Sequence, residues 1–311
     1  GVVIDGAGNL YVCQWSSFAI RKITPEGLVT TLAGRGDTPG AVDGDAATAR
    51  FQSIHGMAID PHGNLYVADC GNHAIRKVTP TGFVSTVAGA LGQSGSVNGP
   101  GAQARFFSPI SLTRAPDGKF YIADFANHTI RVLDPSGTVS TLAGSPAAVG
   151  TADGQGAAAR FNYPVDLSVD WAGDILVSDR GNHTIRRVTP TGSVTTIAGL
   201  GGSSGSSNGI GSAARFNGPH GIQVGPDGIL YVADRDNRTI RKGVPSFGST
   251  LAQSSLGAPV DIQNATIKML KNLELNAHTK SEPGIYINNE KIASLGLRIK
   301  KGTAHHGLSI N

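Results

Sequence analysis

The sequence has few cysteines, few aromatic residues and little charge. Two of the 311 residues are cysteines, 6% are aromatic and 15% are charged. Cys13 and Cys70 form neither a Cys-x-x-Cys pair nor part of a Cys/His cluster, so they indicate no structural zinc site. We expect both to be unpaired core residues.

Long hydrophobic runs and strong charge are also missing. No run of eighteen or more apolar residues occurs, so no membrane-spanning helix is predicted. A net charge of +4 is small for this length and indicates no nucleic-acid partner. The chain begins at Gly1 without a basic and apolar leader, so we expect a truncated start from which targeting cannot be read.

Glycine, by contrast, is abundant, with 43 residues, and much of it belongs to a repeat. The repeated segment occurs as NLYVCQWSSFAIRKITPEGLVTTLAG, NLYVADCGNHAIRKVTPTGFVSTVAG, KFYIADFANHTIRVLDPSGTVSTLAG, DILVSDRGNHTIRRVTPTGSVTTIAG and a shorter fifth copy, ILYVADRDNRTIRKGVP. The period is 55 residues, as the spacing of one isoleucine shows: Ile20, Ile75, Ile130, Ile185 and Ile240. Repeats of this length are typical of propellers and solenoids.

Within one repeat the pattern predicts four strands. GMAIDPHGNLYVAD is two alternating segments around a Pro-x-Gly-Asn turn, and HAIRKVTPTGFVSTVAG is two more around a Thr-Pro-x-Gly turn. Four antiparallel strands repeated without a helical pattern predict a propeller blade. We therefore predict an all-β fold, a propeller of about five blades over residues 1–248. The fifth blade has three clear strands and a degraded fourth at residues 249–253.

The array resembles the NHL-repeat β-propellers, which are named for an Asn-His-Leu tripeptide. It is matched here by Asn72-His73, Asn127-His128 and Asn182-His183, with Ala or Thr in the third place. The resemblance implies a binding scaffold, and the Asp-Gly and Ala-Arg-Phe elements between the copies resemble those of bacterial, typically extracytoplasmic, members. Because the family more often closes its ring with six blades, we expect blades upstream of Gly1 to be missing.

The polar residues that recur with the blade are expected to be structural. Aspartates that end the second strand favour hydrogen bonds to backbone N–H groups; they are Asp69, Asp124, Asp179 and Asp234. Arginines of the third strand are expected to have partners within the blade; they are Arg76, Arg131, Arg186 and Arg241. Arginines of the Ala-Arg-Phe connector are expected to hold that loop in place; they are Arg50, Arg105, Arg160 and Arg215.

Functional residues are expected where the blades differ. The repeated histidines, such as His73, would be distributed around the ring, whereas the starts of the inner strands should meet at its axis. There the sequence has His55, Asp166 and His220, with Ile110 and Ser111 at the matching places of another blade. Some members of the family are zinc-dependent lyases with axial histidines, so a hydrolase or lyase with an axial metal is one alternative.

Composition changes abruptly after residue 259. The last 52 residues hold 4 of the 43 glycines, and lysine replaces arginine as the common cation. VDIQNATIKMLKNLEL, residues 260–275, has apolar residues near helical spacing and predicts a helix. GIYINNEKIASLGLRI predicts two strands around Asn288-Asn289. We therefore predict a linker at 249–259 and a small α+β segment at 260–311.

This segment resembles octanoyltransferase of lipoate biosynthesis, in the biotin/lipoate protein ligase superfamily, through EPGIYINNEKIASLGLRIKKGTAHHGLSIN. The resemblance implies that Lys291 matches the catalytic lysine. It also implies substrate-binding residues, namely Ser294, Leu295, Gly296, His306 and Gly307. Acyl carrier protein and a lipoyl domain would be its partners, and the join to the propeller would be a gene fusion or a chimeric sequence.

The octanoyltransferase reaction needs a cysteine thioester, which the lysine assists by stabilising the thiolate. The family's cysteine is expected downstream of Asn311, and its amino-terminal substrate-binding half is replaced by the propeller. The sequence therefore favours an interaction scaffold without a cofactor over a lipoyl(octanoyl) transferase. It does not choose among a protein, peptide, glycan or small-molecule ligand. The propeller indicates an extracytoplasmic location and the tail a cytoplasmic one.

Overall fold

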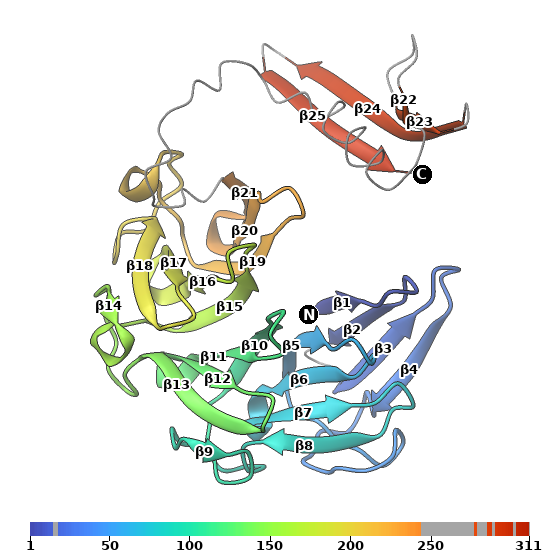
Figure 1. Ribbon diagram of the computed structural model, residues 1–311, viewed down its shortest axis with the longest axis vertical. Helices are drawn as coiled ribbons and strands as arrows, with labels where there is room; N and C mark the ends of the chain where they lie inside the picture. Colours follow the sequence, from blue (N-terminus) through green and yellow to red (C-terminus); the bar gives the residue numbers. More distant parts are fainter. Residues whose placement is uncertain (15–17, 244–276, 279–284, 288–289, 301–302, 311) are drawn as a thin grey trace. The chain divides into compact units, whose positions relative to one another are not determined.

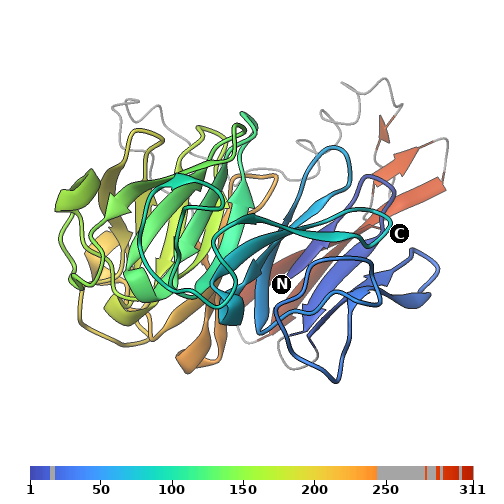
Figure 2. The same cartoon turned by 90° about the horizontal axis from the view of Figure 1, so that it is seen from below.

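The computed structural model describes residues 1–14, 18–243, 277–278, 285–287, 290–300 and 303–310 (Figure 1). It divides the chain into two compact units, Gly1–Ser246 and Phe247–Asn311. The first unit is a five-blade all-β propeller, which confirms the predicted fold class. Figure 2 shows the same succession of blades from below, from blue in blade 1 to orange in blade 5.

Each blade is an antiparallel sheet whose first strand is its inner strand, nearest the centre in Figure 1. Blade 1 is β1 (Val2–Ile4), β2 (Leu10–Gln14), β3 (Ala19–Ile23) and β4 (Val29–Gly34). Blade 2 is β5 (Ile54–Ile59), β6 (Leu65–Asp69), β7 (Ala74–Val78) and β8 (Val84–Ala88). Blade 3 is β10 (Pro109–Arg114), β11 (Phe120–Asp124), β12 (Thr129–Leu133) and β13 (Thr138–Gly144), with β9 (Gly99–Pro100) added beside β13.

Blade 4 is β15 (Pro164–Val169), β16 (Ile175–Asp179), β17 (Thr184–Val188) and β18 (Ser193–Ala198), with β14 (Gly154–Gln155) beside β18. Blade 5 has three described strands, β19 (Pro219–Val224), β20 (Leu230–Asp234) and β21 (Thr239–Gly243). Short 3-10 turns complete the unit: η1 (Cys70–Asn72), η2 (Phe125–Asn127), η3 (Gly156–Ala158), η4 (Arg180–Asn182), η5 (Gly211–Ala213) and η6 (Arg235–Asn237). The degraded fourth strand predicted at 249–253 lies outside the described residues.

The repeated turn residues explain why the strands reverse where they do. In blade 2, an Asp60 carboxylate oxygen accepts hydrogen bonds from the N–H groups of His62 and Asn64, both at 2.9 Å. The second turn closes through the Gly82 N–H, which donates to the Thr79 carbonyl at 2.8 Å, and Gly82 has a φ of +88°. A side chain there would be strained, because this left-handed conformation favours glycine.

The core lies between the blades. One face of each sheet packs against the opposite face of the next, and a buried phenylalanine of the connector, such as Phe106, fills each junction. The repeated isoleucines Ile20, Ile75, Ile130 and Ile185 are 0% exposed within these clusters. Ile240, the equivalent residue of blade 5, is 72% exposed. The apolar residues that recur every 55 positions are therefore buried between neighbouring blades. Blade 5 has an apolar face that no further described blade covers.

The second unit contains the described strands β22 (Ala277–His278), β23 (Ile285–Ile287), β24 (Glu290–Lys300) and β25 (Thr303–Ile310) in one antiparallel sheet. β23 and β24 pair on either side of residues 288–289. The helix predicted at 260–275 lies outside the described residues.

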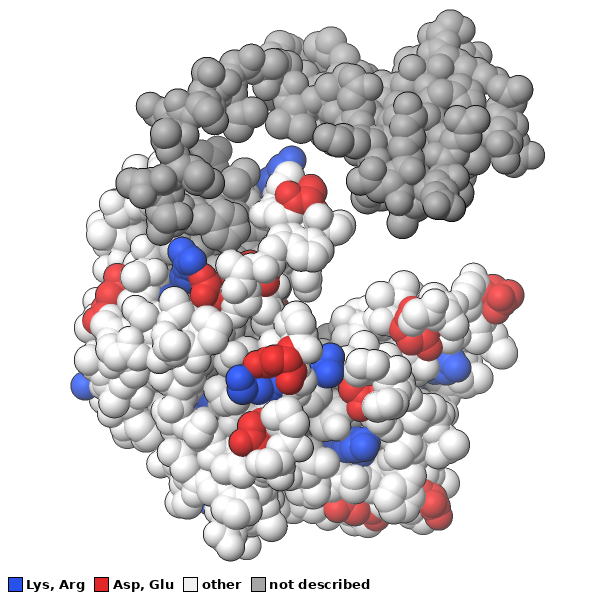
Figure 3. All heavy atoms as spheres, in the orientation of Figure 1, with Lys and Arg blue, Asp and Glu red and all other residues white. Residues whose placement is uncertain are grey.

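The surface charge of the propeller and the hydropathy of its helices do not single out a binding face. On the face shown in Figure 3, positive and negative side chains are interspersed and form no large patch of one sign. Among the described residues, no helix has the length and apolar character needed to cross a bilayer.

Candidate functional site

The polar residues that recur with each blade are engaged in holding the propeller together. In blade 3, Arg131 Nη1 donates to Asp124 Oδ2 at 2.8 Å, and both side chains are fully buried. Asp124 also accepts hydrogen bonds from the Phe107 N–H and the Asn127 amide. The same pairing occurs in blades 2, 4 and 5, as Asp69–Arg76, Asp179–Arg186 and Asp234–Arg241. These residues are structural and are not available to a ligand.

The repeated histidines join neighbouring blades. His73 Nδ1 accepts a hydrogen bond from the Ser108 N–H of the next blade at 3.1 Å, and His128 and His183 do the same with Tyr163 and Gly218. Accepting at Nδ1 requires a neutral ring, and burial lowers the pKa of His73 and His128. These histidines are distributed around the ring and do not converge.

The connector arginines hold their own loops, as predicted. Arg50 Nη1 donates to the carbonyls of Ala47, Thr48 and Ala49 at 2.7 to 2.8 Å. The equivalent arginines make comparable bonds: Arg105 to Ala102, Arg160 to Ala157, and Arg215 to Ser212. The remaining candidates for a site are the polar residues that differ from blade to blade.

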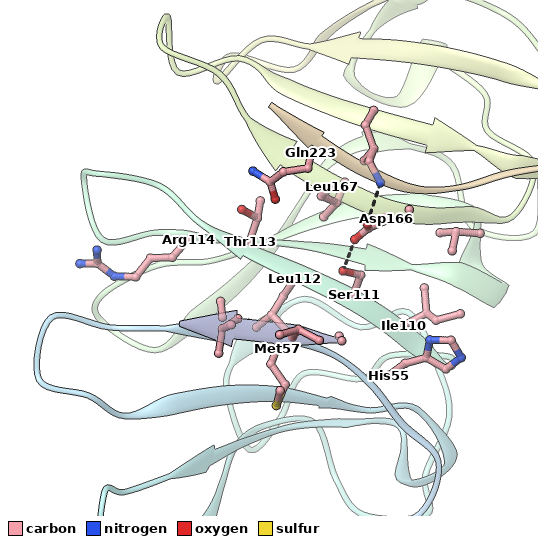
Figure 4. A pocket seen from close by; sticks show the side chains of 18 of the residues that line it. His55, Met57, Ile110, Ser111, Leu112, Thr113, Arg114, Asp166, Leu167 and Gln223 are labelled. Carbon is pink, nitrogen blue, oxygen red and sulfur yellow. Dashed lines mark hydrogen bonds between the residues drawn. The ribbon is translucent and has the colours of Figure 1, made fainter. Parts of the chain in front are cut away.

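A cavity of about 530 Å³ lies at the centre of the propeller, lined by residues of all five inner strands (Figure 4). Its volume suits a small organic molecule. Met57, Ile110 and Leu112 supply apolar wall, and His55, Ser111 and Asp166 are among its polar groups. The three residues proposed from the sequence, His55, Asp166 and His220, all line this one cavity.

An irregularity in the inner strands exposes these side chains. The ladder between β5 and β6 breaks between Ile54 and Met57, and the β15–β16 and β19–β20 ladders break at the equivalent places. Such bulges reorient side chains locally and are frequent beside binding sites. β5 and β10 pack so closely here that residue 56 has to be glycine, because a Cβ on Gly56 would approach the Ser111 Cα to 2.6 Å.

Asp166 connects three inner strands. Its Oδ1 accepts a hydrogen bond from Ser111 Oγ of β10 at 2.6 Å, and its Oδ2 accepts one from the Ile222 N–H of β19 at 2.9 Å (Figure 4). Burial raises the pKa of Asp166, and the two hydrogen bonds oppose that shift because they favour the carboxylate. The group is therefore held rigidly and still borders the cavity.

His55 and His220 lie beside each other in the cavity, although they come from β5 and β19. Their ring centroids are 6.0 Å apart. Burial lowers the pKa of His55, and burial together with the neighbouring His55 lowers the pKa of His220 to about 4. Both rings are therefore neutral at pH 7, and each neutral imidazole has one donor and one acceptor nitrogen.

The other end of the cavity was not predicted from the sequence. Thr113, Arg114 and Gln223 line it at the far ends of β10 and β19 (Figure 4). Arg114 is half-buried, and within the described residues its guanidinium makes no hydrogen bond or ion pair. The sequence could have singled out Arg114, because the equivalent positions of other blades hold the apolar residues Ile59, Val169 and Val224.

The described part of the chain has few residues that could bind a metal ion or act as a reactive thiol. There, no group of three or more His, Cys, Asp or Glu side chains is placed to hold a metal ion. Cys13 and Cys70 are both free thiols, and Cys70 is only half-buried, so it is not the core residue that was expected. Cys13 is buried, and its thiol contacts the His55 carbonyl oxygen at 2.7 Å.

The tail residues predicted by resemblance lie on two paired strands. Lys291, Ser294, Leu295 and Gly296 are in β24, and His306 and Gly307 are in β25. Gly296 pairs with Gly307 in the β24–β25 ladder, and Lys291 pairs with Tyr286 of β23.

Comparison with known families assigns the repeats. The family model for the NHL repeat matches residues 51–78, 161–188 and 216–242. This chain contains NHL repeats. NHL repeat-containing protein 2 of Bos taurus is 30% identical over 270 residues, which cover 75% of this chain and 37% of that protein. The chain therefore spans little more than a third of that NHL relative.

The end of this NHL-repeat chain is similar to a different protein. Over 51 residues it is 53% identical to octanoyltransferase of Vesicomyosocius okutanii, a match that covers 16% of this chain and 25% of the enzyme. The short segment similar to octanoyltransferase is thereby confirmed.

Among solved structures, an auxiliary nutrient binding protein from Bacteroides ovatus has a TM-score of 0.59 and 23% identity, covering 78% of this chain and 57% of that one. At this identity the similarity establishes the propeller fold of the NHL repeats and nothing further.

Proposed function

We propose that this NHL-repeat chain is a binding protein whose central cavity holds a small hydroxylated carboxylate. The observation that carries the proposal is the meeting of non-repeating polar side chains in one cavity of about 530 Å³. A few polar groups set among apolar walls are typical of sites for small molecules. Buried pairs such as Asp124–Arg131 recur with the blades, whereas Arg114, His55 and His220 occur once each in the array and line this cavity.

The polar groups indicate the chemistry of the ligand. His55 and His220, both neutral, and the Ser111–Asp166 pair offer donors and acceptors suited to hydroxyl groups. Arg114 lies at the other end, where it also lines a second pocket with Asp60 and Tyr66, and its guanidinium is a charged donor fork that matches a carboxylate. An apolar wall that includes Met57 suits the carbon skeleton between them.

Calorimetric titration with D-galacturonate and D-galactose tests this function. We expect the acid to bind and the neutral sugar, which lacks the carboxylate, to bind at least about tenfold more weakly, since a charged hydrogen bond is lost. Arg114→Gln should weaken galacturonate binding by a similar factor. Arg35→Gln is the matched control, because Arg35 is exposed and pairs with Asp37 in a surface loop. Equal affinity for both sugars, or no binding of either, would contradict the proposal.

For the tail, residues 260–311, we propose an octanoyltransferase-like segment without transfer activity of its own. A lysine matching Lys291 assists a thiolate in that family, and both cysteines of this chain belong to the propeller. The tail's resemblance supports a cytoplasmic origin and that of the propeller an extracytoplasmic one, joined through residues 249–259.

We expect the full chain to catalyse no octanoyl transfer from acyl carrier protein to a lipoyl domain above the uncatalysed background. The full chain and its Lys291→Ala variant should give the same rate when the octanoylated domain is followed by mass spectrometry. Transfer by the full chain that disappears in Lys291→Ala would show the opposite, that the tail is an active enzyme.

A further inference from the structure

A second cavity, of about 350 Å³, lies between blades 2 and 3. Blade 2 contributes Tyr66 of β6 and the β5–β6 turn that includes Asp60, and blade 3 contributes Phe120 of β11 and Asp134 of the β12–β13 turn. Arg114, at the end of β10, lines both this cavity and the central one. Every residue that lines the second cavity belongs to the described part of the propeller.

Three of the lining residues depart from the repeat, and all three belong to blade 3. Arg114 stands where the other blades have isoleucine or valine. Asp134 stands where blades 1, 2 and 4 have threonine, and Phe120 stands where the other blades have leucine or isoleucine. Residues that stabilise the scaffold recur with the blades, whereas these three occur once each and meet at one cavity. Their meeting indicates a ligand.

The cavity has charges of both signs that do not pair with each other. Of the ion pairs in the described part of the chain, none joins Arg114 to Asp60 or to Asp134. Asp134 Oδ1 accepts hydrogen bonds from Ser136 Oγ and from the Thr138 N–H. The bond from Ser136 is the main cause that lowers the pKa of Asp134, so the group is a carboxylate at pH 7. Each carboxylate oxygen has two lone pairs, so acceptor capacity remains for a ligand.

The guanidinium of Arg114 reaches this cavity. A Cβ built on Gly118 would lie 3.7 Å from Arg114 Nη2 and 3.4 Å from Pro135 Cγ, so the guanidinium and the residue after Asp134 flank the same glycine. Burial and the Asp60 charge raise the pKa of Tyr66, and the Arg114 charge opposes that rise. Positive and negative groups therefore both act on the interior of the cavity.

The rest of the cavity has a fixed apolar wall. The ring centroids of Tyr66 and Phe120 are 4.1 Å apart with 32° between the ring planes, and Val87 and Leu133 extend this wall. Phe120 and Leu133 are both buried in the core of the propeller, so the wall is held in place. A few polar groups beside an apolar wall are typical of a site for a small molecule.

We propose that this cavity binds a free α-amino acid with a large apolar side chain. Arg114 binds the carboxylate through its donor fork, and Asp134 accepts a hydrogen bond from the ammonium group. The side chain packs against Tyr66 and Phe120. A ligand with one charge would leave one of the two protein charges uncompensated, whereas an amino acid compensates both. This inference goes beyond the proposed function and does not rest on it.

Titration calorimetry of the full chain with L-phenylalanine and its analogues tests the site. L-Phenylalanine should bind saturably with a Kd below about 1 mM. Phenethylamine lacks the carboxylate and hydrocinnamate lacks the ammonium group. Each should bind at least about tenfold more weakly, because a charged hydrogen bond is lost. L-Alanine should also bind more weakly, because it leaves the aromatic wall uncovered.

Protein variants separate direct contacts from effects on the fold. Asp134→Asn keeps an oxygen for the hydrogen bonds of the turn but loses the charge, so it should weaken L-phenylalanine roughly tenfold and leave hydrocinnamate unchanged. Arg114→Gln should weaken L-phenylalanine by a similar factor and leave phenethylamine unchanged. Asp117→Asn is the matched control, because Asp117 pairs with Lys119 at 2.6 Å in the β10–β11 turn and does not line the cavity. It should leave every affinity unchanged.

The absence of saturable L-phenylalanine binding, or equal affinities for L-phenylalanine and its two analogues, would overturn the proposal. Loss of hydrocinnamate binding in Asp134→Asn would also overturn it, because Asp134 would then act through the fold of its turn. Asp134 and Tyr66 do not line the central cavity, so a failure of galacturonate binding would leave the L-phenylalanine result intact. Failure of L-phenylalanine binding alone would likewise leave the proposed function standing.

Discussion

Arg131→Ala is expected to lower the free energy of unfolding by about 3–5 kcal/mol at pH 8. The arginine is fully buried and donates to Asp124, to the Arg105 and Val97 carbonyls and to the Asn98 side chain. Its removal leaves the Asp124 carboxylate in the core without a countercharge, and that unpaired charge is the main cost. Urea unfolding followed by circular dichroism measures the effect.

The loss of stability in Arg131→Ala should be larger at high pH than at low pH. Burial already raises the pKa of Asp124 to about 6, and without Arg131 that pKa rises further above its unfolded value. A raised carboxyl pKa stabilises the folded state at low pH, and this contribution is lost as the pH rises through the folded pKa. The variant should therefore lose less stability at pH 5 than at pH 8.

Arg241→Ala is the matched control for this prediction. Arg241 makes the same 2.8 Å contact with Asp234, but its side chain is 14% exposed in the last described blade. Water can solvate the remaining carboxylate there, so we expect a loss of about 1–2 kcal/mol. Equal losses in the two variants, or a loss for Arg131→Ala that does not change with pH, would contradict the desolvation argument.

The blades were predictable from the sequence because the 55-residue period holds across all five copies and the second turn has the same Pro-x-Gly pattern in the first four. The hydrogen-bond and charge partners of residues within the blades were less predictable. Asp69 was expected to accept backbone hydrogen bonds, and it accepts one from Gln52, seventeen residues earlier, while its charge partner is Arg76. These contacts depend on how the connector folds back onto the sheet, which periodicity does not specify.

The central cavity was predictable in part, for a related reason. Comparison of equivalent positions at the starts of the inner strands singles out His55, Asp166 and His220, which line it. The same comparison applied to the ends of those strands would have found Arg114. The bulges that turn these side chains into the cavity, and the 6.0 Å approach of two histidines from different blades, follow from ring geometry and have no signature in one repeat.

Asp166→Ala is expected to abolish galacturonate binding, with a decrease in affinity of at least about a hundredfold, and to cost about 1–3 kcal/mol of stability. The substitution removes the carboxylate that accepts hydrogen bonds from both Ser111 Oγ of β10 and the Ile222 N–H of β19. Both the cavity wall and its polar group are lost. Titration calorimetry and urea unfolding on the same preparation measure the two effects.

Ser168→Ala separates the structural part of this effect from the binding part. Ser168 lies two residues further along β15, is buried, and accepts a hydrogen bond from the Val224 N–H of β19 at 3.0 Å, but it does not line the cavity. It should cost comparable stability, about 1 kcal/mol, while galacturonate affinity stays within about twofold. If both variants lose affinity in proportion to their stability, Asp166 acts through the packing of β19 alone and the cavity is not the binding site.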